Sequence, residues 1–368
     1  MNKYIYLILI VTLISCNKEK QTKINAHEII FSTETDNENL LTSEFIDTSY
    51  FIPLETNDNC LIKWIRKIVF EGQRIFIFDP AGNNKILIFD NKGKFINTVG
   101  NIGQGPGEYA ELYDFCVDSV SRQIFLLCAR GVIMCYDYTG HFKKKYTLES
   151  NLRAWKIEYF DDHFYFIVQE PDFFNLVITD NNFKIKQKFF PDKEFSENDV
   201  LLVHPLKVVD SGMQYIRYID NYIYLIKNHK DITGQYAIDF GKNTIDFAEL
   251  KKLNENVLKE KMKTLRGDIY SFTQNTGHAI VYYLDNDKFV ISIYDKKSHT
   301  AKNYFLENIS DKYLGNYYPL FFRYLTANKE FVADIYPAIL FQKNPTEYIK
   351  EMHLSEDDNP VLYVVKMK

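Results

Sequence analysis

A glycine-rich stretch from Gly100 to Gly107 contains or borders the polar side chains best placed to bind a ligand. Gln104, Glu108 and Tyr109 lie within it or directly after it, and glycines let backbone and side chains approach a ligand closely. It is not a phosphate-binding loop, because it lacks the G-x-G-x-x-G spacing and no Gly-Lys-Ser/Thr follows. The alternative is a purely structural crossover, which glycines also permit. We expect Gln104, Glu108 and Tyr109 to line a ligand-binding site.

Two arginines are further candidates for the same site. Arg66 and Arg153 lie near the starts of the first and third sequence repeats described below, where each could pair with an acidic group of a ligand. The alternative is a surface or inter-repeat salt bridge, the more common role of such an arginine.

Sequence patterns for catalysis and metal binding are missing. The eight histidines are scattered, without the H-x-x-x-H or H-E-x-x-H spacing of a zinc site. No G-x-S-x-G nucleophile motif occurs. The carboxylate pairs Asp161-Asp162 and Asp357-Asp358 lie in polar stretches that indicate turns. We therefore expect no catalytic residue, no metal and no cofactor.

The N-terminus has the pattern of an export signal. Asn2 and Lys3 precede an apolar run to Ile14, which is too short to span a bilayer. The ending Leu13-Ile14-Ser15-Cys16 resembles a bacterial lipobox, in which Cys16 is lipidated and begins the mature chain. The alternative is an ordinary signal peptide with a chance cysteine. The lipobox predicts a signal peptide at residues 1–15 and a lipid anchor in a Gram-negative cell envelope, most readily the outer membrane.

The sequence as a whole has the composition of a folded globule. It is 46% hydrophobic and 25% charged, with 29 Phe and 27 Tyr, and such aromatic content favours strands. The formal net charge of −5 does not indicate a nucleic-acid partner. Residues 16–44 are polar and aperiodic, so we interpret them as a tether, partly ordered if the apolar patch Ile29-Ile30-Phe31 forms a strand. Residues 45–368 form the folded domain.

Short apolar runs of strand length follow one another along this domain. They are continuous rather than alternating, which indicates strands buried on both faces, as in stacked sheets. Asp, Asn, Gly or Pro bounds each of them. The clearest runs are Ile75–Phe78, Ile86–Phe89, Ile124–Leu127, Phe164–Val168, Tyr222–Ile226 and Phe289–Ile293.

A turn pattern repeats through the chain. Phe89-Asp90-Asn91-Lys92-Gly93 returns as Tyr136-Asp137-Tyr138-Thr139-Gly140, and weaker copies contain Asp180, Asp239 and Asp295. Asp can accept a hydrogen bond from an amide two residues on, and Gly or Asn accepts a positive φ, so strand pairs reverse there. The aspartates lie roughly 43 to 59 residues apart, which fits one four-stranded propeller blade per repeat.

Counting repeats predicts an all-β fold, a six-bladed β-propeller. The last blade would use Tyr318–Phe322, Phe331–Ile335 and Val361–Val365. It lacks a fourth strand, which Ser49–Leu54 from the N-terminal end could supply, so that no edge stays open. Five or seven blades are the alternatives, since the later repeats diverge.

The chain resembles a known family at several of these motifs. They are similar to those of the six-bladed β-propeller lipoproteins abundant in Bacteroides and its relatives, which are distantly related to NHL-repeat propellers. The resemblance implies the fold and the location, and no reaction. It rests on Phe51–Thr56, Phe89–Gly93, Gly100–Tyr109, Tyr236–Gly241 and Asn359–Leu362.

Two features lie outside the repeat pattern. Apolar residues at helical spacing predict an amphipathic helix inserted at residues 249–266, and a second, shorter one over 346–354. The first would cap a propeller face as packing or, alternatively, act as a lid. Apart from Cys16, the four cysteines are expected to be buried thiols, because Cys116 and Cys135 would lie two strand spacings apart.

Two functional classes fit these observations. The first is a non-catalytic binding or scaffold module that recognises a glycan, peptide or protein at a propeller face. The second is a propeller enzyme, a polysaccharide lyase or hydrolase, whose site is assembled from several blades. The absence of a catalytic motif favours binding, although the fold itself decides neither.

Overall fold

The computed structural model describes most of the chain. The described residues are 28–29, 38–82, 84–149, 152–168, 174–191, 205–209, 212–217, 221–241, 257, 260–261, 264, 266–317, 319–342 and 345–368. The predicted signal peptide and Cys16 lie outside them, as does most of the predicted helix at 249–266. Of that segment, Val257, Glu260 and Lys261 are helical, whereas Thr264 lies in a turn and Arg266 begins a strand.

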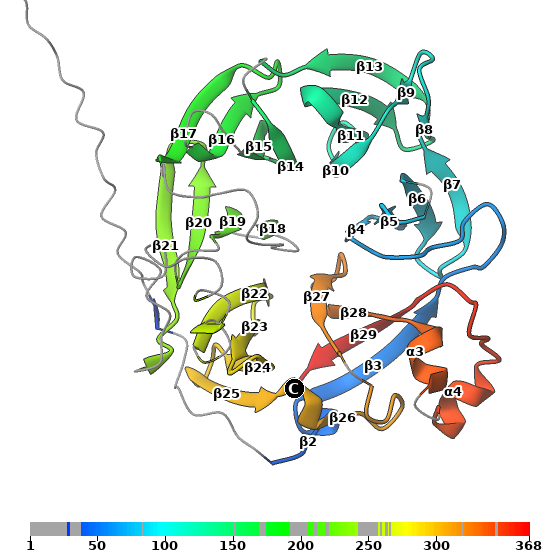
Figure 1. Ribbon diagram of the computed structural model, residues 1–368, viewed down its shortest axis with the longest axis vertical. Coiled ribbons are helices and arrows are strands. Elements are labelled where there is room, and N and C mark those ends of the chain that lie inside the picture. The colour runs from blue at the N-terminus through cyan, green and yellow to red at the C-terminus, as the bar shows by residue number, and fades with distance from the viewer. Residues whose placement is uncertain are drawn as a thin grey trace, which may run out of the picture.

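Six antiparallel sheets are arranged as blades around a central axis (Figure 1), which confirms the predicted six-bladed β-propeller. In blades 1 to 5 the strands follow chain order from the axis outwards. Blade 1 holds β4 (Lys67–Glu71), β5 (Arg74–Asp79), β6 (Lys85–Asp90) and β7 (Phe95–Val99). Blade 2 holds β10 (Leu112–Asp118), β11 (Gln123–Cys128), β12 (Val132–Asp137) and β13 (Phe142–Thr147).

The remaining blades repeat this order. Blade 3 holds β14 (Ala154–Phe160), β15 (His163–Val168), β16 (Phe174–Asp180) and β17 (Ile185–Pro191). Blade 4 holds β18 (Leu206–Val209), β19 (Gly212–Ile216), β20 (Tyr222–Asn228) and β21 (Asp231–Ala237). Blade 5 holds β22 (Arg266–Gln274), β23 (His278–Asp285), β24 (Lys288–Asp295) and β25 (Thr300–Phe305).

Burial between neighbouring blades explains the continuous apolar runs. In β5, the four residues Ile75–Phe78 are completely buried although they alternate between the two faces of the sheet. Ile75 and Ile77 pack in the core shared with blade 6, whereas Phe76 and Phe78 pack in the core shared with blade 2. Both faces of each blade therefore need apolar side chains.

The predicted aspartate turns join the third and fourth strands in four blades. In blade 1, Asp90 Oδ1 accepts hydrogen bonds from the N–H groups of Lys92 and Lys94, both at 2.9 Å. Asp137, Asp180 and Asp295 accept equivalent bonds in blades 2, 3 and 5.

The prediction was wrong for blade 4. Asp239 lies after the fourth strand, and the turn between β20 and β21 is instead built on Asn228, whose Oδ1 accepts from Lys230 N–H at 2.9 Å. Asn offers the same side-chain oxygen as Asp, so it serves this turn equally well.

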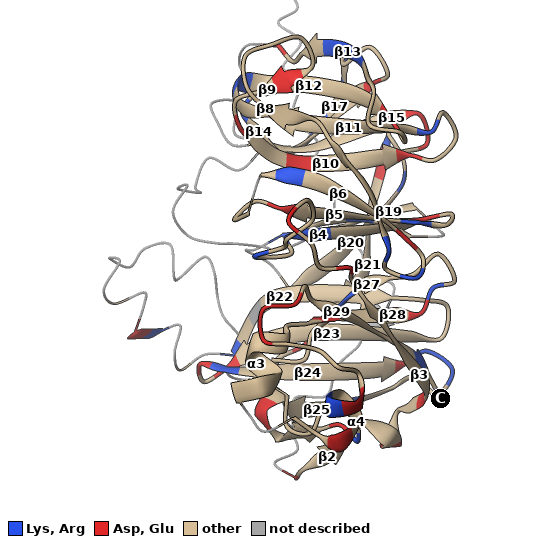
Figure 2. Ribbon diagram, turned by 90° about the vertical axis from the view of Figure 1, so that its right-hand side faces the viewer, with Lys and Arg blue, Asp and Glu red and all other residues tan. Residues whose placement is uncertain are grey.

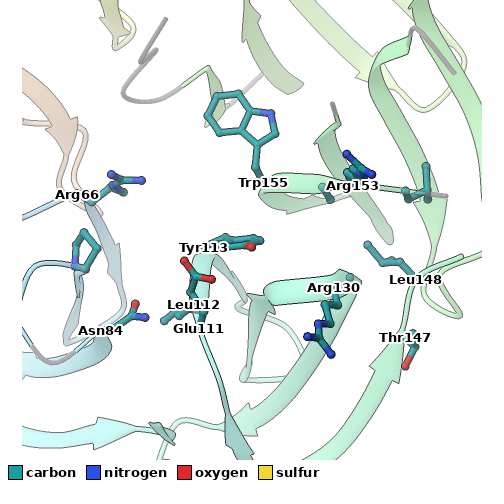
Figure 3. A pocket seen from close by; sticks show the side chains of 14 residues that line it. Arg66, Asn84, Glu111, Leu112, Tyr113, Arg130, Thr147, Leu148, Arg153 and Trp155 are labelled. Carbon is teal, nitrogen blue, oxygen red and sulfur yellow. The ribbon is translucent and has the colours of Figure 1, made fainter. Parts of the chain in front are cut away.

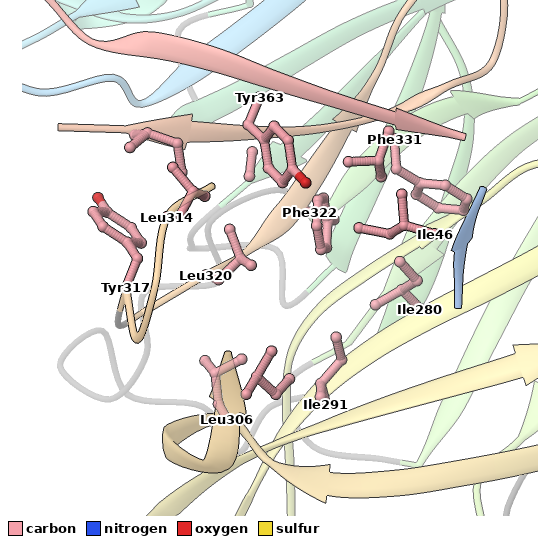
Figure 4. Packing of buried hydrophobic residues seen from close by; sticks show 14 of the residues in the cluster. Ile46, Ile280, Ile291, Leu306, Leu314, Tyr317, Leu320, Phe322, Phe331 and Tyr363 are labelled. Carbon is pink, nitrogen blue, oxygen red and sulfur yellow. The ribbon is translucent and has the colours of Figure 1, made fainter. Parts of the chain in front are cut away.

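Blade 6 is closed by strands from both ends of the chain, as predicted. It holds β27 (Phe322–Leu325), β28 (Phe331–Ile335), β29 (Val361–Met367) and, outermost, β3 (Ile46–Pro53). The first of these begins at Phe322, later than the sequence suggested. Strand β3 pairs antiparallel with β29 from Pro53 opposite Val361 to Ile46 opposite Met367. Figure 4 shows the core beneath this closure, where Ile46 and Tyr363 pack with residues of blades 5 and 6.

The predicted tether is partly ordered. Strand β1 (Glu28–Ile29) pairs in parallel with the outer strand β21 of blade 4. Strand β2 (Leu40–Leu41) pairs in parallel with β26 (Ile309–Ser310), which follows η4 (Leu306–Asn308), and η1 (Thr42–Glu44) leads into β3. The N-terminal segment thus contacts blade 4, then the end of blade 5, before it closes blade 6.

The helices and cysteines largely agree with the sequence. Helix α4 (Glu347–Glu351) falls within the predicted 346–354 segment and is capped by Thr346, while α3 (Pro337–Gln342) was not predicted. Cys60, Cys116, Cys128 and Cys135 are buried free thiols, as expected, and Cys116 and Cys135 both lie opposite Phe125. Among the described residues, none of the helices has the length and apolar character needed to cross a membrane.

The two faces of the disc differ in the loops that they present. All innermost strands run in the same direction, so their first residues meet at one face, which we call the entry face. Helix α3, which follows the end of β28, and the C-terminus lie on opposite sides of the disc (Figure 2). Helix α3 is therefore on the entry face.

Candidate functional site

The innermost strands of blades 2 and 3 each begin with a bulge that presents one residue at the entry face, and in blade 1 the residue before the innermost strand lies at the same face. In blade 2, Leu112 pairs with Cys128 and Asp114 with Leu127, which leaves Tyr113 unpaired. In blade 3, the same shift leaves Trp155 unpaired. In blade 1, the Arg66 N–H donates to the Phe78 carbonyl although Lys67 already pairs with Phe78. Bulges redirect side chains and are frequent beside functional sites.

These three residues line one pocket on the entry face. The cavity has a volume of about 810 Å³ and is bounded chiefly by Arg66, Glu111, Tyr113, Arg130, Arg153 and Trp155; we call it the arginine pocket (Figure 3). Its volume is typical of small-ligand sites. The rings of Tyr113 and Trp155 stand between Arg66 on one side and Arg130 and Arg153 on the other.

A buried carboxylate holds the chain that carries Arg66. Asp79 accepts hydrogen bonds from the N–H groups of Lys63 at 2.8 Å and Trp64 at 3.2 Å. It also accepts from Ala81 and Gly82, at the turn between β5 and β6. A Cβ atom at Gly82 would lie 2.1 Å from Asp79 Oδ2, so only glycine fits there. The segment before Arg66 is thereby fixed to the turn that contributes Pro80 to the pocket.

Arg130 projects from a strained turn. It lies between β11 and β12 with φ 62° and ψ 29°, a left-handed conformation that is unusual for an arginine. The flanking residues are held on both sides, because Ala129 N–H donates to the Glu111 carbonyl and Leu148 N–H donates to the Gly131 carbonyl. Such strain is maintained where the surrounding structure fixes the backbone, often at functional sites.

The arginine pocket has an excess of positive charge. Its lining contains three guanidinium groups and one carboxylate, that of Glu111. Burial raises the pKa of Tyr113, and the nearby negative charge of Glu111 raises it further. Among the described residues none forms an ion pair with any of the three arginines, and all three line the cavity.

The structure brings together two of the five predicted ligand-binding residues. Arg66 and Arg153 both line the arginine pocket, from blades 1 and 3. Gln104, Glu108 and Tyr109 are not among its lining residues. They belong to the crossover from β7 to β10, in which β8 (Asn101–Ile102) pairs with β9 (Glu108–Tyr109).

The glycine-rich crossover is folded back on itself. The Glu108 carboxylate accepts a hydrogen bond from the Gly105 N–H at 2.8 Å. Tyr109 is buried, and its hydroxyl donates at 2.8 Å to the carbonyl of Asn84, a pocket residue. Tyr109 therefore supports the pocket from behind, whereas ligand contact by the exposed Gln104 and Glu108 stays a prediction.

A buried ionic cluster joins blades 1, 2 and 3 inside the central channel. Lys67 Nζ lies 2.5 Å from Glu158 Oε1 and 3.4 Å from Asp114 Oδ1. It also donates to the Phe115 carbonyl at 2.6 Å. Burial alone would lower the pKa of Lys67, but the two carboxylates raise it above its ordinary value. Burial raises the pKa of Glu158 to about 7, because Lys67 and Lys156 oppose it only in part and the charge of Asp114 adds to it.

Sequence reasoning missed four of the six residues that chiefly bound the arginine pocket, namely Glu111, Tyr113, Arg130 and Trp155. Tyr113 and Trp155 are each the second residue of an innermost strand, whereas Arg66 directly precedes the innermost strand of blade 1. Aligning the sequence repeats on their innermost strands, rather than on the aspartate turns, would have brought Arg66, Tyr113 and Trp155 to nearly the same place in the repeat. No sequence pattern pointed to Arg130 as a pocket residue, because its place there depends on a left-handed turn at a residue other than glycine.

The chain belongs to a family named only as a domain of unknown function, DUF4934, whose model matches residues 26–366. No curated protein matches the sequence.

Solved structures resemble this chain in fold. A protein of Bacteroides fragilis, provisionally named an exported protein, matches with a TM-score of 0.77 and 20% identity, over 92% of this chain and 99% of its own. U3-55K matches with a TM-score of 0.45 and 9% identity over 86% of this chain and 98% of its own. The extracellular domain of a hybrid two-component protein of B. thetaiotaomicron matches with a TM-score of 0.42 and 10% identity, over 78% of this chain and 32% of its own. Only the first is close enough to support an argument, and at that identity it supports the fold alone.

Proposed function

We propose that this member of the DUF4934 family is an exported, lipid-anchored binding protein that holds an anionic ligand in the arginine pocket without converting it. The observation that carries the proposal is the set of three arginines, contributed by three blades, around one cavity with a single carboxylate. Guanidinium groups bind carboxylate, sulfate or phosphate oxygens in pairs of parallel hydrogen bonds, which gives both strength and orientation.

The composition of the pocket supports binding rather than catalysis. Among its described lining residues there is neither an imidazole nor a thiol, and Glu111 supplies the one carboxylate. General acid–base catalysis needs a proton-transfer group with a pKa near the working pH. Arginine does not supply one, because it stays protonated. The pocket is therefore suited to holding charge in place.

Export and anchoring are supported by the sequence and by the name of the similar B. fragilis protein. The lipobox-like ending at Cys16 is the basis for the lipid anchor. A Cys16→Ala variant should leave the membrane fraction or accumulate at precursor size. Recovery of the variant in membranes at wild-type level and size would overturn the anchoring proposal.

Ligand binding can be tested by calorimetry on the purified protein. The probes are polygalacturonate and polyglutamate as anionic polymers, with neutral dextran as the reference. The variant Arg66→Gln/Arg130→Gln/Arg153→Gln should weaken anion binding more than about tenfold, since each lost charged hydrogen bond is worth roughly 1.5–3 kcal/mol. Arg122→Gln is the matched control, because Arg122 is exposed in the turn between β10 and β11 at the opposite face.

The proposal fails if neither anionic polymer binds, or if the triple variant binds as the wild type does. Release of new products from a bound polymer would show turnover and would overturn the non-catalytic assignment.

A further inference from the structure

A second aromatic platform lies on the entry face, beside the arginine pocket. Trp64 precedes β4 and its side chain is 47% exposed, although tryptophan is generally well buried. Its indole stacks on the ring of Tyr336, with centroids 5.8 Å apart and planes at 16°. Tyr336 follows β28 directly, at the end of that strand that reaches the entry face. One side of the indole is thus covered by blade 6, while the exposed part stays open to solvent.

The platform is rigid. The Trp64 N–H donates to Asp79 at 3.2 Å, and the next residue, Ile65, donates to the Tyr336 hydroxyl at 2.8 Å. The Tyr336 N–H in turn donates to the Tyr317 hydroxyl at 3.0 Å. These hydrogen bonds fix the backbone at Trp64 and Ile65, and the indole ring is stacked on Tyr336, so the side chain loses less conformational entropy on binding than a freely rotating one would.

The platform lies beside the pocket along the chain. Trp64 and Arg66 are two residues apart, so their Cα atoms are at most about 7 Å apart. Ile65 between them is buried, whereas Trp64 is exposed and Arg66 is partly exposed. Asp79, which accepts a hydrogen bond from the Trp64 backbone N–H, directly precedes Pro80 in the pocket wall. Within the pocket, the rings of Tyr113 and Trp155 lie next to Arg66 (Figure 3).

We infer that the ligand of the arginine pocket is an acidic oligosaccharide whose chain extends from the pocket to Trp64. This inference rests on the proposed function and names its ligand class. The carbon-bound hydrogens on one side of a sugar ring lie flat against an aromatic ring, and its carboxylate or sulfate group pairs with arginine. Acidic peptides also pair with arginine clusters, so polyglutamate serves as the competing ligand in the test. The described pocket is built from strand beginnings and turns.

The test compares ligands of different length. Calorimetry would use galacturonate monomer and a short oligogalacturonide, with a sulfated carrageenan oligosaccharide as a second arm and polyglutamate as the peptide reference. The oligosaccharides should bind more tightly than the monomer. Trp64→Ala should reduce oligosaccharide affinity by about tenfold, a change of 1.4 kcal/mol, and leave the weak monomer binding unchanged. Trp64→Phe, which keeps an aromatic ring, should retain most of the wild-type affinity for the oligosaccharide.

Phe142→Ala is the matched control, because Phe142 is 38% exposed at the start of the outer strand β13, away from the entry face. The inference is overturned if monomer and oligosaccharide bind equally, if Trp64→Ala has no effect, or if polyglutamate binds more tightly than both oligosaccharides. In each of these cases anion binding by the arginines survives. Loss of all anion binding would instead remove the proposed function itself.

Discussion

Arg130 shows how a single residue can serve the pocket at the expense of the fold. Its left-handed backbone is a conformation that glycine adopts without strain and an L-residue with a side chain does not. The neighbouring hydrogen bonds to Glu111 and Leu148 keep the turn in this shape. Glycine would therefore suit the backbone here better, whereas arginine adds a guanidinium group to the pocket lining.

The variant Arg130→Gly separates these two effects. It should leave the free energy of unfolding unchanged or raise it by up to about 1 kcal/mol, because the strain is relieved. Anion affinity should fall about tenfold, because one charged hydrogen-bonding partner is lost. Urea unfolding and calorimetry measure the two quantities. A loss of stability with unchanged binding would show that Arg130 is structural.

Glu158 makes stability depend on pH. Its ordinary pKa of 4.5 is raised to about 7 by burial, so between these values the folded protein keeps a proton that the unfolded chain releases. The free energy of unfolding must then fall as the pH rises from about 4.5 to about 7. The variant Glu158→Gln should flatten this part of the stability–pH curve, measured by urea unfolding across the range. A slope equal to that of the wild type would contradict the assignment.

At the scale of elements, the closing pair β3 and β29 has the largest expected effect. Val361–Val365 are all buried, and β29 lies between β28 and β3. Deleting residues 361–368 would leave two strands of blade 6 unpaired on one side and uncover the cores shared with blades 1 and 5. We expect aggregation or loss of the cooperative thermal transition. A truncated protein with the wild-type melting temperature would show that closure is dispensable.

Most strands could be predicted from the sequence because the physical requirement is local and repeated. Each strand needs apolar residues on both faces and a turn residue at its end, and the closure followed from an unpaired N-terminal strand. Blade 4 was misread because Asn228 replaces the expected aspartate.

The site was harder to predict than the strands. A bulge changes which way Tyr113 and Trp155 point without changing the apolar pattern around them. In the glycine-rich loop, the Glu108 side chain bonds to the loop's own backbone, and ligand contact by Gln104 and Glu108 stays a prediction. Arg66 and Arg153, which were predicted from their places near the start of a blade, line the pocket, and their contact with a ligand also stays a prediction.

At the scale of the whole molecule, the N-terminal segment adds contacts outside the ring. Removing residues 17–39 would delete β1 and its pairing with β21, but would keep β2, η1 and β3. We expect the melting temperature to fall by only a few degrees, because the six four-stranded blades stay complete. Thermal unfolding of both deletion variants, 17–39 and 361–368, would measure the difference between their melting temperatures. Collapse of both variants would mean that β1 is essential to the ring.

The route of the N-terminal segment also decides how the molecule would respond to mechanical load. A pull applied ahead of residue 28 reaches β1 on blade 4 first, then β2 beside β26, and only afterwards the closing strand β3. The two short parallel pairings would yield in turn and lengthen the chain between the point of attachment and the ring. The β1–β21 and β2–β26 pairings would therefore separate before the β3–β29 pairing that closes the propeller carries the full force.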